Sequence, residues 1–293
     1  MITQDRALDA IVQHLTRESD RRSLVAPLGT RDCRQAWQGR CYRKPWDYRI
    51  TAAIPHLNTA EPLATVIDLL RRQTISPYIL IIDTGSDEVT CQKLEHLRAD
   101  DVEIHYLRGH AYMHPSAPIA AAMDVAFALC QTDYLFATHT DVFPRRQDLL
   151  EYLLDKNLAV IGYEMSPREG TDNWQGVVNH AATLFDMKVM RYHGITWNML
   201  RYFERGHSRR EVPGWPDTES GLALCLQDAM LTPHFLGRDR NTLRFRDDNI
   251  DHTRSYTGSR LYCTGTNLEE SSQQQMTKAL KEAKQRMEDW DNS

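Results

Sequence analysis

The chain has 293 residues, of which 41% are hydrophobic and 26% are charged, a composition typical of a globular protein with a sizeable core. No stretch approaches the roughly 20 apolar residues that a membrane span needs, and the first residues do not form a signal peptide, so we expect a cytoplasmic protein. The net charge of −5 disfavours a dedicated nucleic-acid-binding protein, but ten Lys or Arg against six Asp or Glu in the first 50 residues keep a nucleic-acid partner open.

The first half of the chain alternates between strand and helix patterns. An amphipathic helix is predicted over 4–22, followed by an irregular stretch to 47. Strands are then predicted over 48–54, 78–82, 102–107, 134–138 and 158–163, and helices over 61–73, 87–98, 116–130 and 148–155. This alternation predicts an α/β fold with a mostly parallel central sheet and helices on both faces.

The pattern is less regular in the second half. It predicts a loop over 164–180, a strand over 181–185, helices over 187–204 and 218–230, and a strand over 233–236. A polar loop, either ordered or lid-like, is predicted over 237–266, before a polar helix over 268–290. We therefore divide the chain into an N-terminal helical extension (1–47), a first half (48–163), a second half (164–266) and a C-terminal helix (267–293).

Polar residues follow three of the predicted strands directly. They are Pro55-His56-Leu57-Asn58, Asp83-Thr84-Gly85-Ser86 and His139-Thr140-Asp141. Right-handed crossovers place the carboxyl ends of parallel strands at one edge of a sheet, where ligands bind. The sequence therefore predicts a ligand site at this edge.

Two of these turns have both a functional and a structural interpretation. Asp83 can accept hydrogen bonds from a nucleotide base or ribose, or it can form an Asx-type turn before the next helix. His139 and Asp141 can both face a divalent metal, which neutralises a diphosphate, or they can simply form a turn.

Two later segments carry further candidates. Asp217 and Glu219 precede a Leu-rich helix, where one carboxylate could take a proton from an acceptor hydroxyl or could favour the helix start. His252 lies in a polar segment, where a lone histidine is more often a surface residue than a ligand.

The order of these motifs resembles that of the family 2 glycosyltransferases, over roughly residues 48–255. Those enzymes have an acidic residue after the second strand, here Asp83. They have an Asp-x-Asp turn after a strand like YLFAT, here His139-Thr140-Asp141, so that His139 replaces the first aspartate. They also have a catalytic carboxylate before a Leu-rich helix, here Glu219 with Asp217 as its rival, and often a late metal-binding histidine, here His252.

The resemblance implies a GT-A fold, with 48–163 binding the nucleotide sugar and 164–266 binding the acceptor. The implied partner is a nucleoside diphosphate sugar, a UDP-sugar foremost, and the implied cofactor is Mn²⁺ or Mg²⁺ held by Asp141, His252 and His139. The implied reaction is an inverting sugar transfer to an acceptor hydroxyl, of a saccharide or a modified nucleic-acid base for example, with Glu219 as the base. The implied nucleotide-sugar contacts are Pro55, His56, Asn58, Asp83 and Thr140. The Arg-Asn pair that usually contacts the nucleotide in these enzymes is absent, and His114 is a candidate to replace it.

Two other functions remain open at this stage. A nucleotidyltransferase would also combine a Rossmann-like sheet with a metal, but such enzymes usually have a Gly-rich phosphate loop after the first strand, and IPHLNTAE contains no glycine. A non-catalytic GT-A domain that binds nucleotides is compatible with the replacement at His139.

Overall fold

A computed structural model describes residues 47–107, 117–165, 176–198, 218–239, 245–253 and 268–292. The predicted N-terminal extension lies outside this range except for its last residue. His114 and Asp217 also lie outside the described residues.

The central sheet has seven strands in the order β3-β2-β1-β4-β7-β6-β8. The described strands are β1 (Ile50–His56), β2 (Tyr78–Asp83), β3 (Val102–Tyr106), β4 (Tyr134–Thr138), β5 (Val142–Pro144), β6 (Val160–Met165), β7 (Val178–Asp186), β8 (His234–Asp239), β9 (Phe245–Arg246) and β10 (Ile250–His252). β1 to β4 run parallel and β8 is parallel to β6, whereas β7 is antiparallel to both of its neighbours. The predicted mostly parallel α/β sheet is therefore confirmed, and it extends across both predicted halves of the chain.

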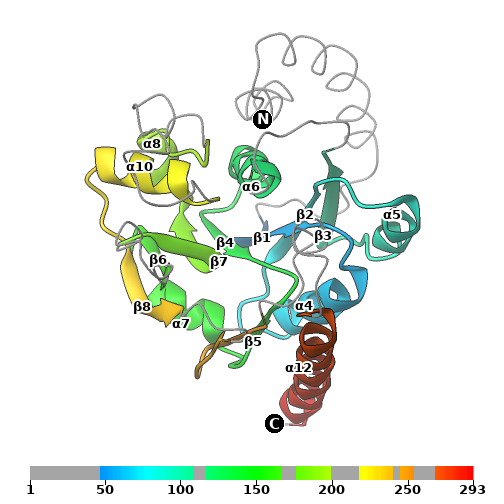
Figure 1. The fold of residues 1–293 in the computed structure, drawn as a ribbon. Helices are drawn as coiled ribbons and strands as arrows, with labels where there is room; N and C mark the ends of the chain where they lie inside the picture. Colours follow the sequence, from blue (N-terminus) through cyan, green and yellow to red (C-terminus); the bar gives the residue numbers. More distant parts are fainter. Residues whose placement is uncertain are drawn as a thin grey trace.

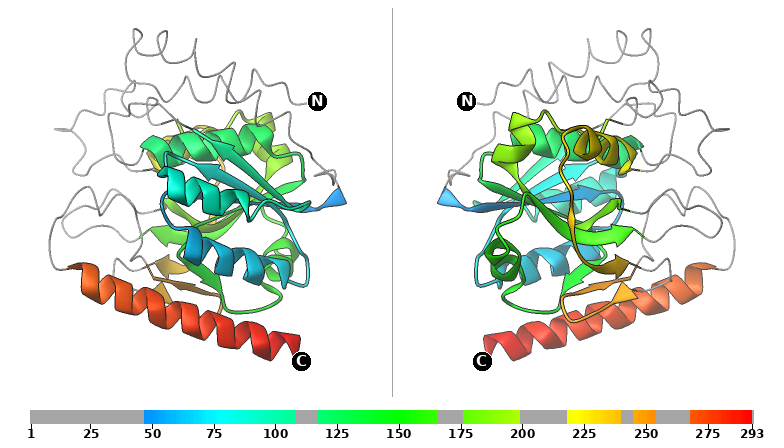
Figure 2. Two further views of the ribbon diagram at one scale, coloured as in Figure 1. Left: turned by 90° about the vertical axis from the view of Figure 1, so that its right-hand side faces the viewer. Right: turned by 90° about the vertical axis from the view of Figure 1, so that its left-hand side faces the viewer.

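Helices cover both faces of this sheet (Figures 1 and 2). The described helices are α4 (Ala60–Arg71), α5 (Glu88–Glu95), α6 (Ala117–Leu129), α7 (Leu149–Asp155), α8 (Met187–Tyr192), α10 (Ser220–Asp228) and α12 (Leu268–Asp291). In Figure 1, α6, α8 and α10 lie above the sheet, and α4, α7 and α12 lie below it. None of these helices is long and apolar enough to cross a membrane.

The first strand shows why the sheet must be covered on both sides. All seven residues of β1 are buried. Ile50, Ala52 and Ile54 belong to the core beneath the sheet, with α4, α7 and α12, whereas Ala53 belongs to the core with α6, α8 and α10. Because successive side chains of a strand point to opposite faces, a strand buried along its whole length fits only a sheet between two helix layers.

A second, small sheet attaches the C-terminal helix to the domain. Its order is β5-β10-β9, with antiparallel pairs. From α12, Arg286 donates a hydrogen bond to the Pro144 carbonyl of β5, and Glu282 pairs with Arg246 of β9 at 2.9 Å. The helix therefore supports the strand that carries His252 (Figure 2).

Four expectations from the sequence are corrected. The helix predicted over 187–204 ends with α8 at Tyr192, because Gly194 takes a left-handed backbone conformation (φ +61°) that a helix cannot continue through. The loop predicted over 237–266 instead contains the end of β8 and the strands β9 and β10. β1 continues through Pro55 and His56, where the predicted strand had already ended, and β7 begins at Val178, inside the loop predicted over 164–180.

Gly221 provides a test of the packing around α10. A Cβ atom at this position would lie 2.4 Å from the Asn198 carbonyl oxygen, a backbone atom that cannot rotate away. We predict that Gly221→Ala lowers the free energy of unfolding by about 1–3 kcal/mol, despite the better helix propensity of alanine.

Gly237→Ala is the matched control, because its Cβ would make only ordinary contacts of 3.7 Å with Tyr163. Thermal unfolding of both variants measures the difference. Equal midpoints for Gly221→Ala and the wild type would contradict the close packing of α10 on the Trp197–Asn198 segment.

Candidate metal centre and active site

The candidate metal centre begins in the turn that joins β4 to β5. His139, Thr140 and Asp141 form this turn, which the backbone bond from Val142 N–H to the His139 carbonyl closes at 3.3 Å. Asp141 is 1% exposed although it carries a carboxylate. A buried carboxylate needs a partner of opposite charge or hydrogen-bond donors.

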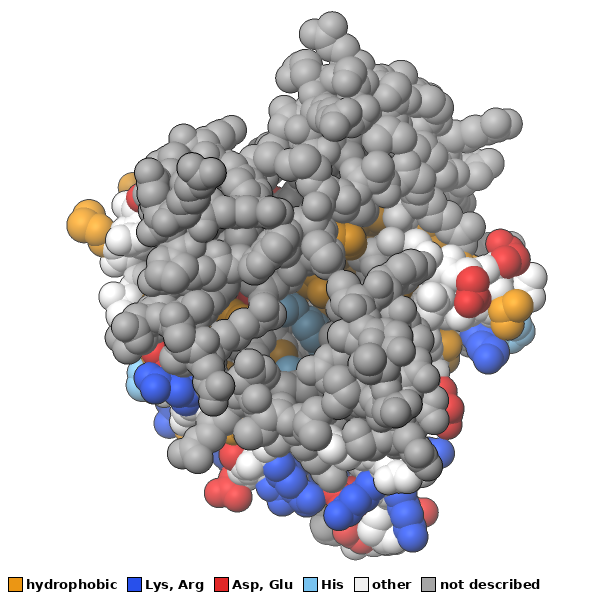
Figure 3. Space-filling model, in the orientation of Figure 1, with side chains coloured by type: hydrophobic (Ala, Val, Ile, Leu, Met, Phe, Trp, Pro, Cys, Tyr) orange, Lys and Arg blue, Asp and Glu red, His pale blue; other side chains and the backbone are white. Residues whose placement is uncertain are grey.

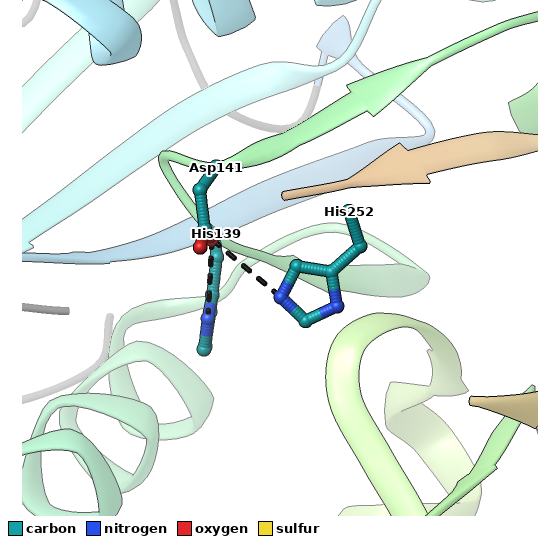
Figure 4. Close-up of side chains that lie close together, drawn as sticks. All are labelled: His139, Asp141 and His252. Atoms are coloured by element: carbon teal, nitrogen blue, oxygen red, sulfur yellow. Dashed lines mark ion pairs between the residues drawn. The ribbon is translucent and has the colours of Figure 1, made fainter. Parts of the chain in front are cut away.

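Strand pairing brings His252 to this turn. β10 runs antiparallel to β5 with His252 opposite Val142, and Thr253 N–H donates to the Asp141 carbonyl at 3.0 Å. His252 Nε2 then lies 3.7 Å and His139 Nδ1 lies 3.9 Å from the same oxygen, Asp141 Oδ1 (Figure 4). The three predicted metal ligands therefore meet, with one ligand atom of each residue within 4.8 Å of the others.

The hydrogen bonding of this group fits a metal ion. His139 Nε2 and Asp141 Oδ2 are buried and have no hydrogen-bond partner among the described residues. Burial and the neighbouring His180 and His252 rings hold the pKa of His139 well below the usual histidine range, so its imidazole is neutral, as a metal ligand must be. Two imidazoles and one carboxylate are three protein ligands, a number that leaves positions open for a substrate oxygen or water.

A second pair of residues lies directly beside this group. His180 in β7 bonds through Nδ1 to Oε1 of Glu219, the residue before α10. The ring centroids of His180 and His139 are 4.0 Å apart. Glu219, the base that the resemblance implies, is therefore connected to the candidate metal centre by His180. The sequence did not predict His180 as a site residue.

The predicted nucleotide contacts at the ends of β1 and β2 form one hydrogen-bonded network. Thr59 N–H donates to His56 Nε2 at 3.1 Å, which leaves the hydrogen on Nδ1 to donate to Asp83 Oδ2 at 2.8 Å. Asp83 also accepts bonds from the backbone of Gly85 and Ser86 and from the Ser86 hydroxyl. Burial opposes ionisation of Asp83, but the bonds from His56 and Ser86 outweigh burial and lower its pKa.

This network makes Asp83 an organiser of its own turn. Its four hydrogen bonds use the acceptor capacity of the carboxylate, as an Asx-type turn would. The helix that follows begins with a different residue, since Asp87 accepts from Thr90 N–H at 2.7 Å. Contact between Asp83 and a nucleotide stays a prediction.

Two threonines connect the nucleotide-side network to the candidate metal centre. Thr59 Oγ1 donates to Thr140 Oγ1 at 3.0 Å, so the loop after β1 touches the turn after β4. Asn58, in a left-handed conformation (φ 53°), accepts from Asp87 N–H and donates its own N–H to Ser86 Oγ. The three strand ends therefore meet at one edge of the sheet, and Figure 3 shows histidine side chains at the bottom of a hollow on this face.

A separate cavity of about 690 Å³ lies between the start of α4 and α12. Asn58 and Thr59 line it together with Lys93, Lys281 and Lys284. It touches the nucleotide-side loop, but none of the candidate metal ligands lines it. We therefore place the reaction chemistry at the histidine–carboxylate group rather than in this cavity.

Comparison with known proteins gives similar folds without a family. The sequence matches no model of a known protein family and no curated protein. One similar solved structure is a mannosyltransferase from Pyrobaculum calidifontis in complex with GDP-Man and Mn²⁺, at 15% identity over 78% of this chain and 66% of that one, with a TM-score of 0.43. Another is the M. tuberculosis glucosyl-3-phosphoglycerate synthase, at 13% identity over 71% of this chain and 75% of that one, with a TM-score of 0.44.

S. aureus TarS is a third similar structure, at 13% identity and a TM-score of 0.39. The alignment covers 51% of this chain but only 30% of TarS, so the chain spans less than a third of that protein. Because all three TM-scores are below 0.5, we base the function on the residues of this chain.

We predict that replacing Asp141 abolishes metal binding at the candidate metal centre. A metal that binds only the folded protein stabilises it by about 2.7 kcal/mol at a concentration 100 times its Kd. We expect Mn²⁺ to raise the melting temperature of the wild type and to leave that of Asp141→Ala unchanged.

Asp155→Ala, which removes an exposed carboxylate at the end of α7, controls for the loss of one negative charge. It should respond to Mn²⁺ as the wild type does. The same Mn²⁺ response in Asp141→Ala would rule out the centre as described.

Proposed function

We propose that this protein is a glycosyltransferase that moves a sugar from a nucleoside diphosphate sugar, a UDP-sugar foremost, to an acceptor hydroxyl. The observation that carries the proposal is the buried group of His139, Asp141 and His252, beside Glu219 and at the strand ends where the nucleotide-side network also lies. A metal centre and a carboxylate at one edge of a parallel sheet are the parts that such a transfer needs.

In the proposed reaction, the acceptor oxygen bonds to the anomeric carbon of the sugar while the bond from that carbon to the diphosphate breaks. The nucleoside diphosphate leaves with the electron pair, and the proton of the hydroxyl passes to the base side of the site at Glu219. His139, Asp141 and His252 would hold a divalent ion, which would supply positive charge that stabilises the departing diphosphate. Inversion at the anomeric carbon follows from the resemblance to the family 2 enzymes.

The carboxyl ends of β1 and β2, together with the turns after β1, β2 and β4, are the proposed nucleotide side. They bring Pro55, His56 and Asn58 together with Asp83 and Thr140, and they are fixed by hydrogen bonds within the protein before any ligand binds. Such a preorganised site loses less conformational entropy on binding than a flexible one.

Glu219 gives the first test of the proposed chemistry. General-base assistance contributes roughly 10²- to 10⁴-fold in rate, so Glu219→Gln should lose about that factor in transfer. The binding of UDP should persist, because the nucleotide-side turns do not contain Glu219. Steady-state transfer from a panel of UDP-sugars and UDP binding by calorimetry measure the two effects.

Glu151→Gln, an exposed position in α7, is the matched control and should keep full activity. Transfer by Glu219→Gln at the rate of the wild type would remove Glu219 from the mechanism.

The donor set also predicts which metal the centre prefers. Mg²⁺ binds oxygen ligands, whereas imidazole nitrogen suits transition metals, so Mn²⁺ fits the group better than Mg²⁺. His139→Asp replaces one nitrogen ligand by oxygen, and we expect it to lower the ratio of Mn²⁺ to Mg²⁺ affinity by about tenfold, equivalent to ~1.4 kcal/mol.

Competition between the two ions, measured by calorimetry, checks this ratio. His193→Asp changes an exposed histidine outside the group and should leave the ratio unchanged. An unchanged ratio in His139→Asp would mean that His139 does not bind the metal.

A further inference from the structure

His180 is held in a fixed position next to the candidate metal centre. It lies in β7, and its side chain is one-tenth exposed. One side of its ring meets His139 at a centroid distance of 4.0 Å, and the Trp197 indole lies 6.1 Å away. Since Trp197 is fully buried, these neighbours limit the rotation of the imidazole.

Glu219 determines which nitrogen of His180 carries the hydrogen. Its Oε1 bonds to His180 Nδ1 and accepts a second bond from the backbone N–H of His180 at 3.3 Å. Because Glu219 Oε1 accepts a hydrogen bond from this backbone N–H, it acts as an acceptor toward the imidazole as well. This favours the tautomer of His180 with hydrogen on Nδ1. His180 Nε2 is then left with a lone pair.

This lone pair has no partner among the described residues, and the atom is buried. His180 is also not one of the three candidate metal ligands, His139, Asp141 and His252, whose ligand atoms lie within 4.8 Å of one another. A buried acceptor left unpaired is unfavourable, so a ligand that donates a hydrogen bond to this atom binds more tightly than one that cannot. A hydroxyl group next to the metal centre is such a donor.

We propose that His180 Nε2 holds the acceptor hydroxyl at the reaction centre, and that Glu219 acts through His180 by fixing the orientation of its ring. This proposal rests on the proposed glycosyl transfer, and it specifies which residue contacts the acceptor hydroxyl and which residue orients that contact. Glu219 is the more deeply buried of the two side chains, at 1% exposed against 10% for His180. It is the His180 ring, and not the carboxylate, that lies against His139 of the candidate metal centre, at a centroid distance of 4.0 Å. A histidine that contacts the reacting hydroxyl while a buried carboxylate orients it is an established way to build a base.

Nitrogen NMR of the histidine rings in the full-length protein tests the proposal without a known acceptor. The His180 ring signals are assigned through the backbone and verified by their loss in His180→Gln. With UDP and Mg²⁺ present, the protein is titrated with ethylene glycol as the hydroxyl probe. 1,2-Dimethoxyethane, which has the same chain without hydroxyl hydrogens, is the matched control probe.

We expect hydrogen on Nδ1 in the wild type, and a saturable shift of the Nε2 signal with ethylene glycol but not with 1,2-dimethoxyethane. Glu219→Ala should weaken this response by about tenfold, since it removes one oriented hydrogen bond. The proposal would be overturned by hydrogen on Nε2, or by equal shifts with both probes. It would also be overturned if the addition of Zn²⁺ in place of Mg²⁺ gave a shift that shows His180 Nε2 bound directly to the metal.

A kinetic measurement separates this proposal from the proposed function. Once an acceptor is found among simple alcohols and sugars, His180→Ala should raise its KM or lower kcat by about tenfold or more while the affinity for UDP is unchanged, and His180→Gln should recover part of the loss. Failure of the wild type to bind or use any nucleotide sugar would overturn the proposed function and this inference with it. Normal transfer by His180→Ala would overturn this inference alone.

Discussion

The main feature of the structure around the strand ends is a small set of buried polar atoms that accept or donate no hydrogen bond among the described residues. His139 Nε2, Asp141 Oδ2, His180 Nε2 and Glu219 Oε2 are all buried without a hydrogen-bond partner among the described residues. Unpaired groups of this kind are uncommon in folded proteins, and each costs roughly 1–3 kcal/mol. Four of them in one cluster are the basis of the proposed ligand site, because a metal with a polar substrate would satisfy both the nitrogens and the carboxylate oxygens.

The rest of the fold supplies the framework that holds this cluster together. β4 ends in the turn with His139 and Asp141, the pairing of β10 with β5 brings His252, and β7 together with the start of α10 brings His180 and Glu219. α12 stabilises the small sheet from outside through Arg286 and Glu282. Segments distant in the sequence therefore fix each side chain before a ligand binds, which is the arrangement expected of a preorganised site.

The central sheet and the candidate metal ligands could be predicted from the sequence. The buried run YILII and the turn that follows Thr138 identify strands and strand ends directly, because a parallel sheet covered on both faces needs apolar runs that end in polar turns. The same pattern predicts His139 and Asp141 as candidate metal ligands, and His252 follows from the resemblance. His180 was missed because it lies inside a strand, in VVNHAATLF, where the pattern indicates core. The signal that could have found it is the Asn-His pair in that apolar run, since buried polar side chains need partners.

The small sheet was not predicted for a different reason. β5, β9 and β10 have three, two and three residues, too few for a periodic pattern, and they lie among charged residues. The pairing of β5 with β10 is also long-range, since β10 lies more than 100 residues after β5, and such a contact leaves no pattern in the local sequence. The position of His252 next to Asp141 is therefore a property of the folded chain.

The location of a bound metal tests the account most directly. A crystal of the protein grown with UDP and Mn²⁺, measured by anomalous diffraction at the manganese edge, shows where the ion binds. We expect one strong anomalous peak in contact with Asp141, His252 and His139, with a phosphate oxygen of UDP on its open side. A peak elsewhere, or none at this group while UDP is bound, would contradict it.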